Sequence, residues 1–262
     1  MSRVGIFIMA YEAVRTLVSA YKRIPAQLKK EAAEIYIIDD GSNDDTYWAA
    51  MGYKLLHNIP NLSVYRNSRN LGYGGNQKKG LRHAIDRGYD IVAVLHGDVQ
   101  YAPERIPDLI QPILDGQADL VFGSRMTGHP LQGGMPLYKF VANKFLTTIE
   151  NWALGMNLSE YHSGFRAYSC AALNKLHFER CTDGFHFDTE ILIQFKEKGM
   201  RIAEVPVPTH YGPESHQVGF GTAVRYGLSI LVSLLEYRLH KSGIRRFRSS
   251  KFNGQPGLDG SR

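Results

Sequence analysis

Short apolar runs alternate with segments of helical periodicity over the first 125 residues of the chain. Continuous apolar runs that end in polar turns are typical of strands buried on both faces of a sheet. Between them, apolar residues recur at spacings of three and four, which predicts helices. Strands alternating with helices favour a mainly parallel sheet that is covered on both faces. The expected strands cover residues 4–10, 34–40, 62–66, 91–95 and 120–123, and helices are expected around residues 14–21, 81–85 and 106–114.

The second half of the chain has a less regular pattern. Pro206 and Pro208 predict that the last strand lies at an edge of the sheet, because proline has no N–H to donate to a neighbouring strand. The sequence contains no internal repeat and no long linker, so one domain over residues 1–240 is expected. The elements expected here are helices over 136–152, 187–198 and 222–237, a loop and strand over 163–169, and a strand over 201–207.

Charge is distributed unevenly along a chain of otherwise ordinary globular composition, with 44% hydrophobic and 21% charged residues. The net charge is +6, and residues 238–262 alone hold seven Lys or Arg and one acid. The remaining residues are neutral overall, so the domain is not expected to bind nucleic acid. The tail, residues 241–262, is expected to be mobile and could contact an anionic membrane.

The expected location is the cytoplasm. Two cysteines are too few for a disulfide framework, which indicates a reducing compartment. No stretch reaches 18 apolar residues, so a membrane-spanning helix is not expected.

Polar side chains follow the predicted strands where ligands bind in parallel sheets, beyond the carboxyl ends. Asp39 and Asp40 end one strand, Asn70 and Asp98 follow two others, and Arg125 follows a fourth. Two carboxylates at a strand end can accept hydrogen bonds from a ribose or a base, or can hold a cation. The alternative is a cluster that caps a helix and orders a turn.

Asp98 and Gln100 form a candidate half-site for Mg²⁺ or Mn²⁺. These ions use few protein ligands and complete their shell with water and substrate phosphates. His96 could add a nitrogen ligand, which would favour Mn²⁺. The alternative is that His96 is a structural hydrogen-bonding residue.

The glycine-rich stretch Leu71 to Gly75 follows the third expected strand. A dinucleotide-binding fingerprint should follow the first strand, and the GxxxxGK[ST] pattern is missing, so neither a Rossmann dehydrogenase nor a P-loop enzyme is favoured. Gly72 either forms a tight turn before a helix or lets the backbone approach a ligand closely.

Seven segments, taken in order, resemble family 2 glycosyltransferases of the GT-A fold, near the dolichol-phosphate mannose synthase and polyprenyl-phosphate glycosyltransferase group. The segments are IIDDGSNDDT at 37–46, NLGYGGNQKKG at 70–80, LHGDVQYAPE at 95–104, GSR at 123–125, SGFRAYS at 163–169, FHFDTEIL at 185–192 and EVPVPTHYGPESH at 204–216. The resemblance implies a Rossmann-like, mainly parallel central sheet flanked by helices in a single domain. Its nucleotide-sugar half would be about residues 1–125 and its acceptor half about 126–240.

The resemblance also implies site residues. Asp98 would be the metal-binding acid of an Asp-X-Asp motif whose first position is His96 here, with Gln100 as a further ligand. Asp188 and Glu190 would lie near the acceptor, and we expect at most one of them to face the site, because neighbours two apart on a helix diverge. Arg125 would face the diphosphate or the sugar and is expected to be catalytic together with Asp188 or Glu190. The donor would contact Glu12, Asp39, Asp40, Asn70, Gly72, Asp98, Arg125, Lys139 and Arg166.

The activity so implied is an inverting, metal-dependent transfer of a hexose or aminosugar from a UDP- or GDP-sugar to an acceptor hydroxyl, with Asp188 ahead of Glu190 as the base. One alternative is a peripheral polyprenyl-phosphate glycosyltransferase on the inner face of the membrane. Lys139 and Ser215-His216 stand where lipid-phosphate-binding members have Arg and Ser-Lys, which weakens that alternative. Another is a non-catalytic module that binds sugar nucleotides, for which His96 in place of an acid is the main support.

Overall fold

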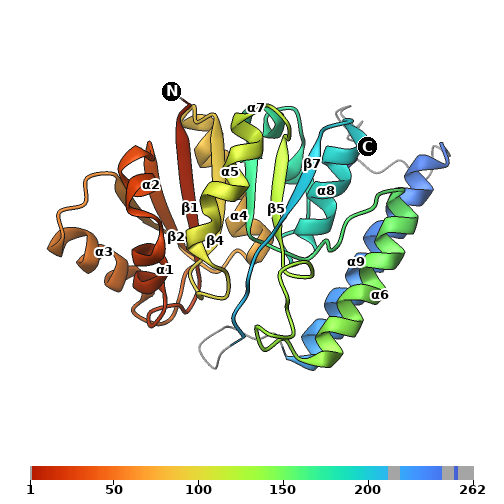
Figure 1. Cartoon of the computed structure of the whole chain (residues 1–262), viewed down its shortest axis with the longest axis horizontal. Helices are drawn as coiled ribbons and strands as arrows, with labels where there is room; N and C mark the ends of the chain where they lie inside the picture. Colours follow the sequence, from red (N-terminus) through yellow and green to blue (C-terminus); the bar gives the residue numbers. More distant parts are fainter. Residues whose placement is uncertain (1, 212–218, 244–250, 253–262) are drawn as a thin grey trace, which may run out of the picture.

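A seven-stranded sheet forms the centre of the computed structural model, which describes residues 2–211, 219–243 and 251–252 (Figure 1). Its strand order is β3-β2-β1-β4-β6-β5-β7. β6 runs antiparallel to its neighbours β4 and β5, and the other neighbouring pairs in this sheet are parallel. The strands are β1 (Val4–Ala10), β2 (Glu34–Asp39), β3 (Leu62–Arg66), β4 (Ile91–His96), β5 (Leu120–Ser124), β6 (Arg166–Ser169) and β7 (Ile202–Pro206).

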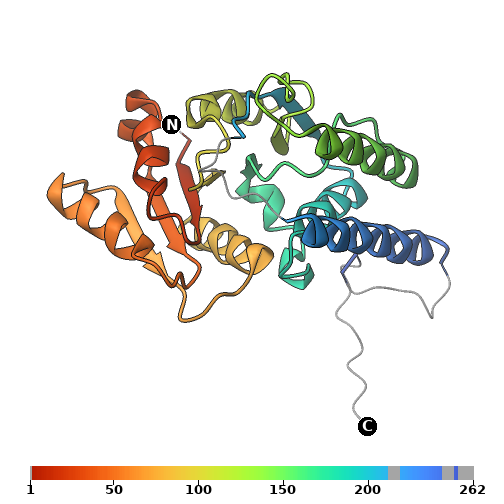
Figure 2. The same ribbon diagram turned by 90° about the horizontal axis from the view of Figure 1, so that it is seen from below.

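Helices cover both faces of the sheet, as the view from below shows (Figure 2). One face carries α1 (Leu17–Arg23), α2 (Ala26–Glu31), α3 (Thr46–Leu56), η1 (Pro103–Arg105) and α5 (Ile106–Leu114). The other carries α4 (Tyr73–Asp86), α7 (Cys170–Leu173), η2 (Phe178–Arg180) and α8 (Phe187–Glu197), with α6 (Leu137–Leu154) and α9 (Phe220–Lys241) packed beyond α8. In the described part of the chain, no helix is both long and apolar enough to cross a bilayer.

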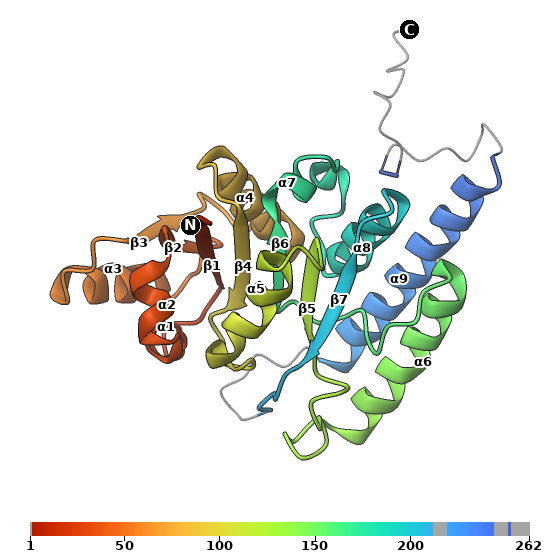
Figure 3. The same ribbon diagram turned by 45° about the horizontal axis from the view of Figure 1, so that its top comes forward.

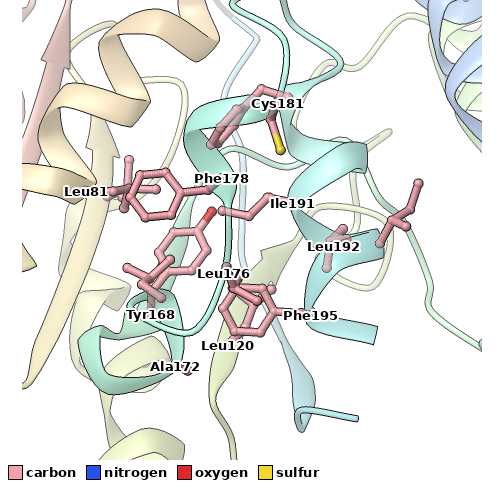
Figure 4. Close-up of a cluster of buried hydrophobic side chains, with 14 of the residues drawn as sticks. Leu81, Leu120, Tyr168, Ala172, Leu176, Phe178, Cys181, Ile191, Leu192 and Phe195 are labelled. Atoms are coloured by element: carbon pink, nitrogen blue, oxygen red, sulfur yellow. The ribbon is translucent and has the colours of Figure 1, made fainter. Parts of the chain in front are cut away.

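Alternate side chains of the central strands enter two separate cores. On β1, Phe7 and Met9 belong to the core under α4 and α8, whereas Ile6 and Ile8 belong to the core under α1 and α5. Figure 4 shows the first core, where Tyr168 lies among Leu81, Phe178 and Ile191. Burial on both sides explains why these strands read as continuous apolar runs in the sequence.

The expected single domain with a mainly parallel sheet is confirmed, and β7 is an edge strand as its prolines predict. Most of the basic tail and the Ser215-His216 pair lie outside the described residues, so the expectations about them stay predictions.

Two glycines in helix interiors should respond oppositely to alanine. A Cβ at Gly80 of α4 would overlap the ring of Phe7, so Gly80→Ala should lower the free energy of unfolding by about 1–3 kcal/mol through overpacking. Gly52 of α3 has no atom within 4 Å of such a Cβ, so Gly52→Ala should raise it by about 0.5–1 kcal/mol. Urea denaturation of the two variants measures both changes, and equal stability would contradict this packing of α4 on β1.

Candidate active site

The loops after β1, β2 and β3 enclose a hollow of about 540 Å³. These loops follow the carboxyl ends of neighbouring parallel strands, where the sequence predicts a ligand site. Asn70, one of the predicted donor contacts, lies in its wall. The lining residues are Tyr11, Gly41, Ser42, Asn43, Arg66, Asn67, Ser68, Arg69 and Asn70.

Asp39 and Asp40 are buried beneath this hollow and order its walls. Oδ1 of Asp39 accepts the N–H of Ser42 at 3.2 Å, and Oδ2 lies 3.3 Å from Nε of Arg66. Oδ1 of Asp40 accepts the amide of Asn67 at 2.8 Å and the N–H of Leu71 at 3.0 Å. Burial raises the pKa of Asp40, although these donors oppose the shift. These contacts show that both carboxylates order the surrounding turns. Contact of either carboxylate with a ligand stays a prediction.

Glu12 lies exposed beside the same hollow, with a positive φ of 47°. Its N–H donates to Oγ of Ser42 at 2.8 Å, which ties the end of β1 to the loop after β2. Its carboxylate is thereby placed near the loop that carries Asn43, whose amide is 3.5 Å from Oε1.

The glycines at the start of α4 make a close approach to the chain itself. Gly72 has a φ of 82°, and a Cβ there would come within 2.7 Å of the carbonyl oxygen of Asp183. The N–H of Gly74 donates to the same carbonyl at 2.7 Å. The positive φ of Gly72 lets the chain enter α4 against the loop before α8, and contact of Gly72 with a ligand stays a prediction.

His96 is the last residue of β4, and Asp98 and Gln100 follow it in the next loop. Oδ1 of Asp98 accepts the N–H of Gln100 at 3.1 Å, around Val99, whose φ of 54° is unusual for a β-branched residue. Burial lowers the pKa of His96, which favours the neutral imidazole that a metal ion requires, although the charge of Asp98 opposes this shift. One carboxylate, one amide oxygen and one imidazole fit Mg²⁺ or Mn²⁺ that shares its shell with substrate phosphates. Among the residues that the structure describes, no cluster of three or more His, Cys, Asp or Glu could hold a metal ion by itself.

Asp188 is buried and belongs to a partly buried hydrogen-bond network that reaches His96. Its Oδ2 accepts the hydroxyl of Tyr73 at 2.7 Å, and its Oδ1 accepts the amide of Gln77 at 3.2 Å. The hydroxyl of Tyr73 is also 3.5 Å from Nε2 of His96. A Cβ at Gly164 would overlap both Tyr73 and His96, so only glycine leaves room for this network. The network brings Asp188 to the metal-side residues, and each of its carboxylate oxygens already has a donor.

Arg166, predicted to contact the donor, is instead fully buried at 0% exposure. Its guanidinium donates to the carbonyls of Ser163 at 2.7 Å, Tyr161 at 2.9 Å and Asp188 at 3.1 Å. It also lies 3.5 Å from the Asp188 carboxylate. This placement does not fit a phosphate ligand, because the guanidinium is already occupied inside the protein.

Glu190 points away from Asp188, toward α9. Its Oε2 accepts the N–H of Thr182 at 2.7 Å, and its Oε1 pairs with Nζ of Lys251 at 2.9 Å and accepts the hydroxyl of Ser233 at 3.2 Å. This placement does not fit a catalytic base, and it agrees with the expectation that at most one of the two acids faces the site.

Arg125 and Lys139 form a basic cluster with Tyr211. The Arg125 Nε donates to the buried Glu160 at 2.9 Å, and one terminal nitrogen donates to the hydroxyl of Tyr211 at 3.3 Å. Nζ of Lys139 lies 6.0 Å from the centre of the Tyr211 ring. Burial, together with the charge of Arg125, lowers the pKa of Lys139. An anion beside this cluster can accept charge-assisted hydrogen bonds from Lys139 and from the N–H groups of Arg125 that Glu160 does not occupy.

Tyr73, Tyr211 and Glu160 belong to this site but were missed by the sequence analysis. Tyr73 and Tyr211 lie within the motif segments, where an interspersed tyrosine could have been a signal. Glu160 lies in none of them, and only its contact with Arg125 identifies it.

A family model described as Glycosyl transferase family 2 matches residues 5–177. A UDP-N-acetylglucosamine--dolichyl-phosphate N-acetylglucosaminyltransferase of Methanococcus voltae is 31% identical over 217 residues, which cover 79% of this chain and 86% of the relative. An undecaprenyl-phosphate mannosyltransferase of Micrococcus luteus is 27% identical over 67% of this chain and 71% of that relative.

The fold also matches a solved structure. A glucosyl-3-phosphoglycerate synthase from Mycobacterium tuberculosis, in complex with Mn²⁺, UDP and phosphoglyceric acid, is similar with a TM-score of 0.69. The match covers 89% of this chain and 78% of that chain, at 19% sequence identity. At this identity the likeness shows the fold.

Proposed function

The chain belongs to glycosyl transferase family 2 and is a glycosyltransferase of the GT-A fold, and from this premise we propose that it transfers a sugar from a nucleoside diphosphate sugar to a polyprenyl phosphate. The sequence alone favours an acceptor hydroxyl over a polyprenyl phosphate, and we propose the opposite order. Because the chain is a glycosyltransferase, the non-catalytic module is no longer a candidate.

The observation that carries the proposal is that Asp188 is buried and that both of its carboxylate oxygens already accept hydrogen bonds. A hydroxyl acceptor needs a general base to remove its proton, whereas a phosphate acceptor is already anionic and needs none. Asp188 is buried, and its two oxygens accept hydrogen bonds from Tyr73 and Gln77. It therefore serves better as the anchor of the network around His96 than as a base that must meet an incoming hydroxyl.

The basic cluster supports the same acceptor. Arg125 is held in place by Glu160, and Lys139 stands at the first turn of α6 beside it. A phosphate monoester can accept charge-assisted hydrogen bonds from both cations. The names of the relatives from Methanococcus voltae and Micrococcus luteus, which specify dolichyl phosphate and undecaprenyl phosphate, also favour a lipid phosphate.

In this proposal the donor is a UDP- or GDP-sugar whose nucleoside lies in the hollow after β1, β2 and β3. Asp98, with Gln100 and His96, would hold a divalent cation, which supplies Lewis-acid stabilisation of the diphosphate leaving group when bound. Arg125 and Lys139 orient the acceptor phosphate. One of its oxygens forms a bond to the anomeric carbon, the bond from that carbon to the donor diphosphate breaks, and the nucleoside diphosphate leaves with inversion.

A matched pair of acceptors tests the proposal. With UDP- and GDP-sugars and Mn²⁺, the protein should glycosylate a short polyprenyl phosphate at least about tenfold faster than the polyprenol of the same length, because only the phosphate needs no base. Product formation is followed by chromatography, and the anomeric configuration by NMR. Equal rates with the two lipids would contradict the proposal.

The variant Asp188→Asn is the control for this experiment, measured below the melting temperature of both proteins. A phosphate acceptor predicts a rate within a few-fold of wild type, since asparagine can still accept the hydroxyl of Tyr73. A loss of about 10²-fold or more would restore Asp188 as the base and favour the hydroxyl acceptor.

A further inference from the structure

α6 and α9 together expose a large set of apolar side chains to solvent. On α9 the exposed positions follow a spacing of four, from Val224 through Leu228 to Val232, and on α6 the same spacing links Leu137, Val141 and Phe145. Side chains four apart lie on one side of a helix, so each helix has an apolar stripe opposite its buried side. We call this surface the α6/α9 face; its apolar members are Leu137, Tyr138, Val141, Phe145, Trp152, Val224, Leu228, Val232 and Leu235.

The two stripes belong to one surface. α6 and α9 run side by side at the end of the molecule farthest from α3 (Figures 1 and 3). Leu146 lies against Gly227 where the helices meet, and the guanidinium of Arg238 lies 4.9 Å from the centre of the Trp152 ring. Nine exposed apolar side chains on two adjacent helices mark an interaction surface.

Cations accompany the apolar stripes on these helices. Lys144, Arg225 and Arg238 are exposed, and Lys241 is exposed but pairs with Glu197 of α8 at 3.1 Å. The acids of the two helices are Glu150, which is buried, and Glu236, which pairs with Lys251. The exposed surface of this helix pair is therefore apolar and basic, and the sequence that follows α9 adds further lysine and arginine.

We propose that the α6/α9 face lies on the surface of an anionic lipid bilayer. Apolar stripes with flanking basic residues are what a helix needs to lie in the plane of the interface, with its apolar side among the acyl chains and its cations at the headgroups. A second copy of the chain is a poorer partner, because a twofold contact through this face would bring like charges together.

The position of the face relative to the active site gives the proposal a consequence. Leu137 and Tyr138 of the face directly precede Lys139, which belongs to the basic cluster with Arg125 and Tyr211. A bilayer under α6 and α9 would therefore hold the headgroup region beside that cluster. The inference rests on the surface alone and can be tested without any enzymatic activity.

The two tryptophans of the chain supply an internal comparison. Trp152 is on the α6/α9 face and is 73% exposed, and Trp48 is on α3 and is 63% exposed. Vesicles of equal parts phosphatidylcholine and phosphatidylglycerol should shift the emission of Trp48→Phe, which retains Trp152, to shorter wavelength. They should leave the emission of Trp152→Phe, which retains Trp48, unchanged.

Vesicle co-sedimentation of the full chain measures the contribution of the face. Phe145→Asp and Leu228→Asp should each lower the partition coefficient at least about tenfold, since each places an anion against anionic lipid. Leu56→Asp, at an 80% exposed position of α3, should leave the partition coefficient unchanged. All three positions are exposed, and circular dichroism checks that each variant is folded.

Three results would overturn the proposal. One is a wild-type protein that does not bind the anionic vesicles, and another is equal loss of binding in all three variants. The third is a wild-type dimer in sedimentation velocity that Phe145→Asp and Leu228→Asp dissociate, which would make the face a contact between copies. Binding that is equal for pure phosphatidylcholine vesicles would contradict the electrostatic part of the proposal.

Discussion

Asp98→Ala is expected to lower turnover by about 10²–10³-fold while leaving the fold intact. The variant loses the carboxylate that would hold the divalent cation, and this cation would stabilise the negative charge of the diphosphate leaving group. Asp98 lies beyond the end of β4 and is half-buried, and its carboxylate accepts the N–H of Gln100, two residues away. Its removal should therefore cost little packing energy. The measurement is consumption of whichever UDP- or GDP-sugar the wild-type protein uses with Mn²⁺.

Asp115→Ala is the matched control for this variant. Asp115 is also an acid that follows a secondary-structure element, and it accepts the amide of Gln111 at 2.8 Å, but it is exposed and belongs to none of the site motifs. Its turnover should equal that of wild type. Calorimetric titration of UDP and GDP should show that Mn²⁺ strengthens nucleotide binding to wild type and to Asp115→Ala but not to Asp98→Ala. Retention of a tenth of wild-type turnover by Asp98→Ala would rule out this role.

The largest effect on stability is expected at Arg166. Arg166→Leu removes three hydrogen bonds to carbonyl groups and leaves Asp188 without its nearby cation in a buried site. Breaking a buried pair in this way typically costs about 3–5 kcal/mol. For a chain of this length each kcal/mol lowers the melting temperature by about 2–4 °C, which calorimetry resolves easily.

Arg201→Leu is the control, because Arg201 makes an exposed pair with Asp119 at 2.9 Å. Such surface pairs contribute about 0–1 kcal/mol. Similar melting temperatures for the Arg166 and Arg201 variants would mean that the buried arginine is not a structural residue, and would return it to the candidates for phosphate binding.

The sequence predicts the sheet well because its strands are buried on both sides. Continuous apolar runs identify β1, β2 and β4 with boundaries close to those in the structure. α3 lacked a clear helical signal, and its Trp48, Leu55 and Leu56 are exposed, so its apolar residues do not mark its buried side. The opposite direction of β6 could not be predicted, because strand direction depends on the path of the preceding connection and leaves no periodicity in the sequence.

The sequence predicts those site residues whose positions follow from the strand order. It does not predict those that are placed by contacts between residues far apart in the chain. The positions of Asp98 and Arg125 follow from the strand ends. The hydrogen bond from Tyr73 to Asp188 joins residues that are 115 positions apart in the chain, and no local sequence pattern indicates it. Arg166 matched a motif, but it lies on β6 between Val94 of β4 and Phe122 of β5, and its side chain is fully buried.

The place of β6 in the sheet sets the span of the active site. Because β6 is inserted between β4 and β5, the carboxyl ends of those two strands are separated by two strand spacings, or about 10 Å. Asp98 follows one of these ends and Arg125 the other, so the backbone of the sheet sets the distance between the carboxylate and the guanidinium. A ligand that reaches both residues must span about this distance, with a cation beside Asp98 and an anionic group beside the N–H groups of Arg125 that Glu160 does not occupy. Substitution of either residue changes the charge at that position, but the distance between the two positions is fixed by the strand order of the sheet.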